Sequence, residues 1–119
     1  MLRLHESQIP MLTDEEIKAI SLLKEKLRSS FTVRKLILFG SKARGDYNKD
    51  SDVDIMVLID EPRTNENRDK LSDIQYDVIT EIFDAPLMCS LENYGDWVAG
   101  NLWIPLKDNI EKEGTEIEI

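Results

Sequence analysis

Residues 39–58 read FGSKARGDYNKDSDVDIMVL, and this stretch decides the fold. The run VRKLILF, residues 33–39, is short and rich in aliphatic residues, so it predicts a strand. It ends in Gly40-Ser41, a polar stretch follows, and DVDIMVLI, residues 52–59, predicts a second strand. Apart from its aspartates, this second run is apolar on both faces, as expected for a strand that is covered on both sides. Two carboxylates therefore stand at the start of a buried strand, close to a glycine-serine turn.

The flanking sequence predicts helices on either side of these strands. Thr13 and Glu16 form a capping-box pattern, and apolar residues then recur at helical spacing. A second helical pattern follows the break at Pro62, and Pro86 is tolerable at the start of a third strand. The expected elements are a helix over 14–29, a strand over 33–39, a helical turn over 41–45, a strand over 52–59, a helix over 66–83, a strand over 86–91, and a C-terminal helical region from Trp97 to Ile110 that Gly114 ends.

Length and composition favour one α/β (α+β) domain over residues 1–119, a small mixed sheet flanked by helices. An apolar share of 41% is enough for a core, and no apolar run is long enough to span a bilayer. The first residues lack the features of a secretory signal. The one cysteine, Cys89, cannot form an internal disulfide. We therefore expect a cytoplasmic protein without membrane contact.

The net charge limits the kinds of molecule that this chain is expected to bind. A formal net charge of -9 disfavours general nucleic-acid binding, because phosphate backbones are met by clustered Lys and Arg. A nucleotide is still allowed, because a cation can screen its phosphates. With only His5 and Cys89 as soft ligands, a tetrahedral zinc site is not expected. Any metal would be a hard cation with oxygen ligands.

The two aspartates and the turn point to phosphate chemistry. Strand side chains alternate, so Asp52 and Asp54 share a face and repel unless a cation or donors neutralise them. Mg²⁺ accepts carboxylates and keeps positions open for phosphate oxygens. Gly40 allows close approach of the backbone to a ligand, and Ser41 adds a hydroxyl donor. Arg44, one turn later, either contacts phosphate or braces the loop.

These features together predict metal-assisted phosphoryl transfer. In a two-metal version, one ion activates the attacking hydroxyl and the other holds the leaving pyrophosphate. A third carboxylate on a neighbouring strand would complete the metal site and help remove the attacking proton.

Gly40-Ser41, Ala43-Arg44-Gly45 and Ser51-Asp52-Val53-Asp54, in this order, resemble the signature of the polymerase-beta-like nucleotidyltransferase superfamily. The likeness covers about residues 33–90 and is greatest to the minimal, antitoxin-like branch. It implies Mg²⁺-dependent transfer of a nucleoside monophosphate from an NTP, with ATP as the expected substrate, to a hydroxyl. Toxin–antitoxin members modify a tyrosine on a HEPN-type toxin partner.

The resemblance also assigns residues. It implies that Gly40, Ser41 and Arg44 bind the nucleotide, and that Asp52 and Asp54 bind the metal ions and are catalytic. The third catalytic and metal-binding carboxylate lies on a later strand in the family, and Asp84 is the best candidate. The Ala-Pro that follows Asp84 departs from the family pattern. Asp77 and Glu81 are poorer substitutes, because helical carboxylates there more often face solvent.

Other residues have simpler interpretations. Ser51 is expected to orient Asp52 in a turn, and Lys42 and Lys49 either balance local acidity or contact a phosphate. Cys89 is expected in the core, because no histidine near it in sequence would activate it. Trp97 and Trp103 are expected in the core or at an interface.

Three functions remain open from the sequence. The first is an enzyme that modifies a protein partner or a small molecule. The second is an antitoxin-like module that neutralises its partner by contact, and the third is a nucleotide sensor that binds NTP without turnover. Neither the preferred base nor the acceptor can be read. Trp103 and the tail at residues 117–119 suggest an extra edge strand or a homo- or hetero-oligomer interface.

Overall fold

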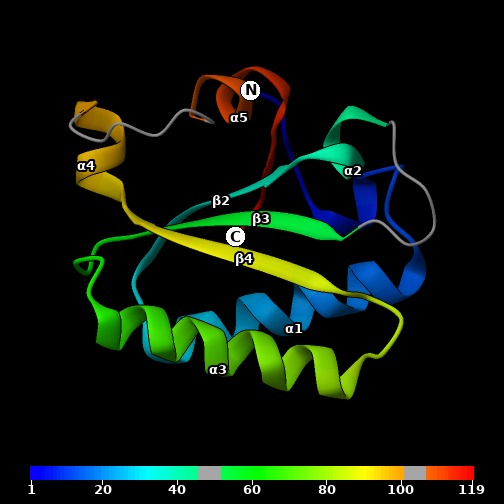
Figure 1. Cartoon of the computed structure of the whole chain (residues 1–119). Coiled ribbons are helices and arrows are strands. Elements are labelled where there is room, and N and C mark those ends of the chain that lie inside the picture. Colours follow the sequence, from blue (N-terminus) through cyan, green and yellow to red (C-terminus); the bar gives the residue numbers. More distant parts are fainter. Residues whose placement is uncertain (46–51, 101–106) are drawn as a thin grey trace.

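The computed structural model describes residues 1–45, 52–100 and 107–119 and has a five-stranded sheet at its centre (Figure 1). The strands are β1 (Arg3–Leu4), β2 (Val33–Phe39), β3 (Val53–Ile59), β4 (Leu87–Asn93) and β5 (Thr115–Ile117). The helices are the 3-10 turn η1 (Glu6–Gln8), α1 (Asp14–Ser30), α2 (Ser41–Arg44), α3 (Asn65–Glu81), α4 (Tyr94–Ala99) and α5 (Lys107–Glu113). The predicted class, a mixed α/β fold with a sheet flanked by helices, is confirmed.

The order of the strands is β1-β5-β2-β3-β4. β2 runs antiparallel to both of its neighbours, β3 and β5. β3 and β4 are parallel, so the chain needs a crossover between them, which α3 provides. In this register Asp54 stands beside Phe39 of β2 on one side and beside Met88 of β4 on the other.

The two faces of the sheet carry different cores. α1 and α3 lie side by side on one face and bury the larger cluster, which includes Leu23, Leu36, Ile55 and Val78 (Figure 1). α4 and α5 lie on the other face, over the smaller cluster of Ile37, Met56, Leu58, Trp97 and Ile110. Because side chains alternate along a strand, Asp54 lies on the same face as Met56 and Leu58.

Most of the predicted elements are confirmed to within two residues. Thr13 and Glu16 form the expected capping box, with hydrogen bonds of 2.9 and 3.1 Å, and α1 ends at Ser30. The strand over 33–39 and the turn of helix after Gly40 are found where the sequence placed them. α3 ends at Glu81, earlier than expected, and β4 extends further, to Asn93.

The two ends of the chain differ from the prediction. The C-terminal region contains two helices, α4 and α5, and Trp103 lies between them, outside the described residues. The N-terminal strand β1 was not predicted. The tail does form a strand, β5, but β1 covers its outer side, so β5 is not an edge. Both strands are too short to show a period, and they form because they pair with each other and with β2. Among the described residues, no helix is long and apolar enough to cross a membrane.

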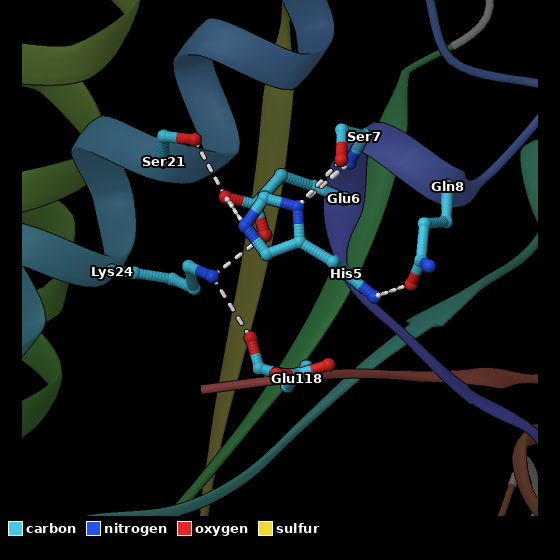
Figure 2. Close-up of polar contacts among 7 residues, drawn as sticks. All are labelled: His5, Glu6, Ser7, Gln8, Ser21, Lys24 and Glu118. Atoms are coloured by element: carbon cyan, nitrogen blue, oxygen red, sulfur yellow. Dashed lines mark hydrogen bonds and ion pairs between the residues drawn. The ribbon is translucent and has the colours of Figure 1, made fainter.

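A buried ion pair connects the two ends of the chain (Figure 2). Glu6 is 1% exposed, and its carboxylate accepts hydrogen bonds from Lys24 Nζ at 2.6 Å and from Ser21 Oγ at 2.5 Å. The same Lys24 ammonium donates to the main-chain oxygen of Glu118 at 2.8 Å. Lys24 therefore joins η1 to the residue that follows β5, and His5 lies beside the carboxylate, with Nε2 at 3.6 Å from Glu6 Oε2.

The pKa of Glu6 follows from these contacts. Burial by itself raises it, but the hydrogen bonds from Lys24 and Ser21 outweigh burial, and the pKa lies below its ordinary value of 4.5. A carboxyl whose pKa is lowered by folding stabilises the folded state above its unfolded pKa. The stabilisation of the folded state by Glu6 is therefore lost as the pH falls below about 4.5, the ordinary pKa, and through the lower pKa that Glu6 has in the folded state.

Lys24→Met should lower the free energy of unfolding by about 3–5 kcal/mol, because it leaves the Glu6 carboxylate buried without its cation. Lys18→Met is the matched control on the same helix, since Lys18 pairs with Glu15 at 3.3 Å on the surface. It should cost less than about 1 kcal/mol. Urea unfolding of both variants measures the difference, and equal losses would show that the buried pair has no special weight.

Candidate functional site

The turn between β2 and α2 is built on Gly40. Its φ of 75° and ψ of -156° lie in a region that is essentially open to glycine alone. A Cβ at this position would collide with Asp54 Oδ2 and lie 3.2 Å from Asp54 Cγ. The backbone of the turn therefore lies against the Asp54 carboxylate. Two residues that the sequence analysis assigned to one site are adjacent in the structure.

Asp52 and Asp54 influence each other electrostatically. Asp54 is half-buried at the start of β3, and Asp52 is exposed just before this strand. Burial raises the pKa of Asp54, the negative charge of Asp52 raises it further, and the charge of Arg44 opposes both. Asp52 is therefore near enough for its charge to act on Asp54, although Asp52 itself lies just before β3.

Arg44 connects this site to α5. Its Nη1 lies 3.6 Å from Glu113 Oε2, so the guanidinium takes part in an ion pair. A small hollow of about 170 Å³ separates the turn from α5 and is lined by Phe39, Gly40, Arg44, Asn109, Ile110 and Glu113. Arg44 is therefore held in place by Glu113, and its positive charge also acts on the Asp54 carboxylate of the site. Sequence reasoning missed Glu113, because no local pattern connects it to the turn.

Lys42 has a structural role. It is 2% exposed, and its Nζ lies 3.0 Å from Glu16 Oε2, so it connects α2 to the first turn of α1. The same Glu16 completes the capping box of α1. Of the two interpretations of Lys42, the structure favours the balancing of local acidity. Lys49 and Ser51 lie outside the described residues.

The structure does not group Asp84, the predicted third carboxylate, with Asp52 and Asp54. Asp84 is exposed in the turn between α3 and β4, and Met88 occupies the position beside Asp54 on β4. Asp77 and Glu81 are exposed on α3. Within the described ranges, no three Asp, Glu, His or Cys side chains are grouped closely enough to hold a metal ion. The role of Asp84 therefore remains a prediction.

Cys89 and Trp97 behave as core residues. Burial raises the pKa of the Cys89 thiol to about 12, so the thiolate needed for nucleophilic attack is scarce at neutral pH. Trp97 is 3% exposed and packs with Met56 and Ile110.

The residues at the turn fit a hard cation. Asp52 and Asp54 supply carboxylate oxygens, the ligands that Mg²⁺ prefers. The raised pKa of Asp54 reflects a negative charge that burial and Asp52 make unfavourable, and a bound cation would relieve it. Gly40 lies beside this carboxylate without a side chain, so a ligand of the ion can approach the backbone.

Comparison with known proteins identifies the family of this chain. The model of the nucleotidyltransferase domain family matches residues 20–83, more than half of the chain. A Methanocaldococcus jannaschii protein, provisionally named a protein adenylyltransferase, is 32% identical over 96 residues, which cover 66% of this chain and 97% of that protein. The chain therefore belongs to the nucleotidyltransferase domain family, and the predicted enzyme class is confirmed.

Two further similarities differ in how much of the chain they cover. The protein adenylyltransferase MntA of Thermococcus cleftensis is 50% identical over 52 residues, which cover 43% of this chain and 52% of that protein. A crystal structure from Sulfolobus solfataricus, provisionally described as a nucleotidyltransferase, has a TM-score of 0.45 and 21% identity. The similarity to this structure covers 88% of this chain and 87% of that one.

Gly40→Ala should both destabilise the protein and disturb the site. A residue with a Cβ at this φ and ψ costs about 1–3 kcal/mol, and the new Cβ also displaces the Asp54 carboxylate. Gly100→Ala is the matched control, because Gly100 has a φ of 71° but no atom lies within 4 Å of the place that its Cβ would take. Urea unfolding should show a loss in both variants and a larger one in Gly40→Ala. Equal losses would mean that the contact with Asp54 is unimportant.

Asp52→Asn should lower the pKa of Asp54, because it removes one of the two causes that raise it. A carbon-13 NMR titration of the Asp54 carboxyl measures this shift. Asp60→Asn, beyond the other end of β3, is the control and should leave the pKa of Asp54 unchanged. An Asp54 titration that does not respond to Asp52→Asn would show that the two carboxylates are not coupled.

Proposed function

We propose that this nucleotidyltransferase transfers AMP from ATP to a hydroxyl group of a protein, with Mg²⁺ bound at Asp52 and Asp54. The observation that carries the proposal is the Gly40 turn lying against the Asp54 carboxylate, on which the charge of Asp52 also acts. The names of the relatives support the adenylyl group and the protein acceptor. The hard oxygen ligands support Mg²⁺.

The reaction forms one phosphorus–oxygen bond and breaks another. The acceptor hydroxyl oxygen attacks the α-phosphorus of ATP, and the bond from this phosphorus to the oxygen that bridges the α- and β-phosphates breaks. Pyrophosphate leaves with that oxygen, and the hydroxyl proton passes to a base. Mg²⁺, when bound, supplies positive charge that stabilises the phosphate oxygens during transfer, in a one-metal or two-metal arrangement.

The chain contributes position and charge to this reaction. Asp52 and Asp54 hold the cation, and the Gly40-Ser41 turn binds the triphosphate beside them. Arg44, held by Glu113, adds a positive charge next to the turn. Asp84 is proposed as the third carboxylate, and it would have to approach the site from the turn before β4.

We propose a separate protein as the acceptor, and a HEPN-type partner, implied by the family resemblance, is the first to test. A module that neutralises such a partner by contact is the second candidate function. The observation that favours it is the exposed position of Asp84 with Met88 beside Asp54, which leaves two grouped carboxylates among the described residues.

Asp52→Asn and Asp54→Asn should each reduce label transfer from α-labelled ATP to the partner by about 100-fold or more, the scale on which lost electrostatic stabilisation acts. Each NTP is incubated with Mg²⁺ and the protein, with and without a HEPN-type partner. Asp60→Asn is the control, because Asp60 forms an exposed ion pair with Arg34 and should retain transfer. Asp84→Asn shows whether the third carboxylate is needed.

The same variants separate the two functions. Label transfer that is lost while the complex with the partner persists identifies an enzyme. Neutralisation of the partner by Asp52→Asn, with no transfer by the native protein, would favour the contact module and contradict the enzymatic proposal.

A further inference from the structure

A groove lies next to the proposed site and runs along the outer edge of β4, with Met56, Ser90 and Glu92 on the face of Asp54 and α3 as its opposite wall. Its volume is about 690 Å³, within the range of roughly 300–1,000 Å³ typical of small-molecule sites. Phe39 and Ile110 line both this groove and the hollow at the Gly40 turn, so the two are neighbours. Phe39 also stands beside Asp54 in the register of β2 and β3. The groove therefore begins beside the strand pair that carries Asp54.

The direction of the groove follows β4. Asp54, Met56 and Leu58 stand beside Met88, Ser90 and Glu92, so these side chains form two parallel rows on one face. At about 3.3 Å per residue, Ser90 lies about 7 Å and Glu92 about 13 Å along the strand from the level of Asp54. A ribose and a base, end to end, can cover this span. The hydrogen-bonding edge of the base would then lie near Glu92.

The outer edge of β4 is already occupied by side chains of its own chain. The Cys89 main-chain nitrogen donates to Gln75 Oε1 at 2.8 Å, and Arg63 Nε donates to the Leu91 oxygen at 2.8 Å. A peptide that added to this edge as a strand would have to break both bonds. The groove therefore suits a ligand that is recognised by side chains on the face of the sheet.

Glu92 is arranged as a hydrogen-bond acceptor in the groove. Its side chain is 13% exposed, and Oε1 lies 3.2 Å from Arg63 Nε. No hydrogen bond to Oε2 is found within the described part of the chain. Burial raises the pKa of Glu92, Arg63 and Arg68 oppose this, and Asp96 adds to it. The carboxylate is thus held by a cation on one oxygen and partly withdrawn from water.

We propose that this groove holds the nucleoside of the NTP, and that Glu92 recognises the base by accepting a hydrogen bond from its exocyclic amino group. The inference rests on the proposed nucleotidyl transfer and adds base selection to it. The 6-amino group of adenine donates to a carboxylate, whereas a base without this donor leaves Glu92 Oε2 without a hydrogen bond in a partly buried place. A site built to bond a polar group discriminates strongly against an analogue that lacks it.

The test compares ATP with purine riboside triphosphate, which has a hydrogen atom in place of the 6-amino group. Dissociation constants are measured with Mg²⁺ by displacement of a fluorescent ATP analogue. Native protein should bind ATP about tenfold or more tightly, the scale of a hydrogen bond to a charged group. In Glu92→Ala the ratio of the two dissociation constants should fall to about one, within a factor of two.

Asp69→Ala is the matched control. Asp69 lines the same groove from α3, so this variant removes a carboxylate from the opposite wall. It should keep the preference of the native protein for ATP. Thermal unfolding of both variants checks that they are folded, and the comparison of the two nucleotides on the native protein needs no variant at all.

The outcomes separate this inference from the proposed function. Equal affinity of the native protein for the two nucleotides, or a preference that survives in Glu92→Ala, would overturn base recognition by Glu92 alone. A preference that also disappears in Asp69→Ala would overturn it as well, because the effect would then belong to the general charge of the groove. Failure of both nucleotides to bind with Mg²⁺ would overturn the proposed function as well.

Discussion

The close approach of Gly40 to Asp54 is the constraint on which the site depends. It requires that β2 and β3 pair with Phe39 beside Asp54, so that the turn after β2 meets the carboxylate at the start of β3. A slip of one residue would turn Asp54 to the face packed by α1 and α3. The apolar cores on both faces fix this register, because the residues that alternate along β3 are buried on each side. The stability of the sheet and the geometry of the site therefore have one cause.

The two ends of the chain support the same sheet on the edge of β2 that faces away from β3. β5 pairs with β2 and β1 pairs with β5, so the strand that leads to the Gly40 turn is interior to the sheet. Lys24 bonds both Glu6 and the main chain at Glu118, and this joins the two short strands to α1. Breaking a buried pair of this kind is strongly destabilising, because it leaves a buried charge without compensation. Residues far from the carboxylates thus help to hold β2 in place.

The side chains of β4 decide what lies beside Asp54 and in the groove. Met88 stands beside Asp54, and Ser90 and Glu92 continue along the same face into the groove. The position beside Asp54 on β4 is apolar, while the acidic side chain of the strand, Glu92, lies about 13 Å away, at the far end of the row. Metal binding and recognition of the base would then be distributed along two parallel strands, with the start of β3 serving the phosphates. The exposed edge of β4 is closed by Gln75 and Arg63, which leaves the face as the surface for a ligand.

The sequence by itself determined the elements with strong local signals and the residues of the Gly40 turn. The capping box of α1, the apolar runs of β2 and β3, and the order of Gly40, Asp52 and Asp54 are read from neighbours a few residues apart. Only the tertiary structure decided the pairing of β1 with β5, the burial of Lys42 on Glu16, the ion pair of Arg44 with Glu113, and the place of Met88 beside Asp54. Each of these depends on contacts between distant parts of the chain, and no local period or propensity encodes such contacts. They form because the sheet must bury both of its faces and pair its strands, and that requirement acts on the whole chain at once.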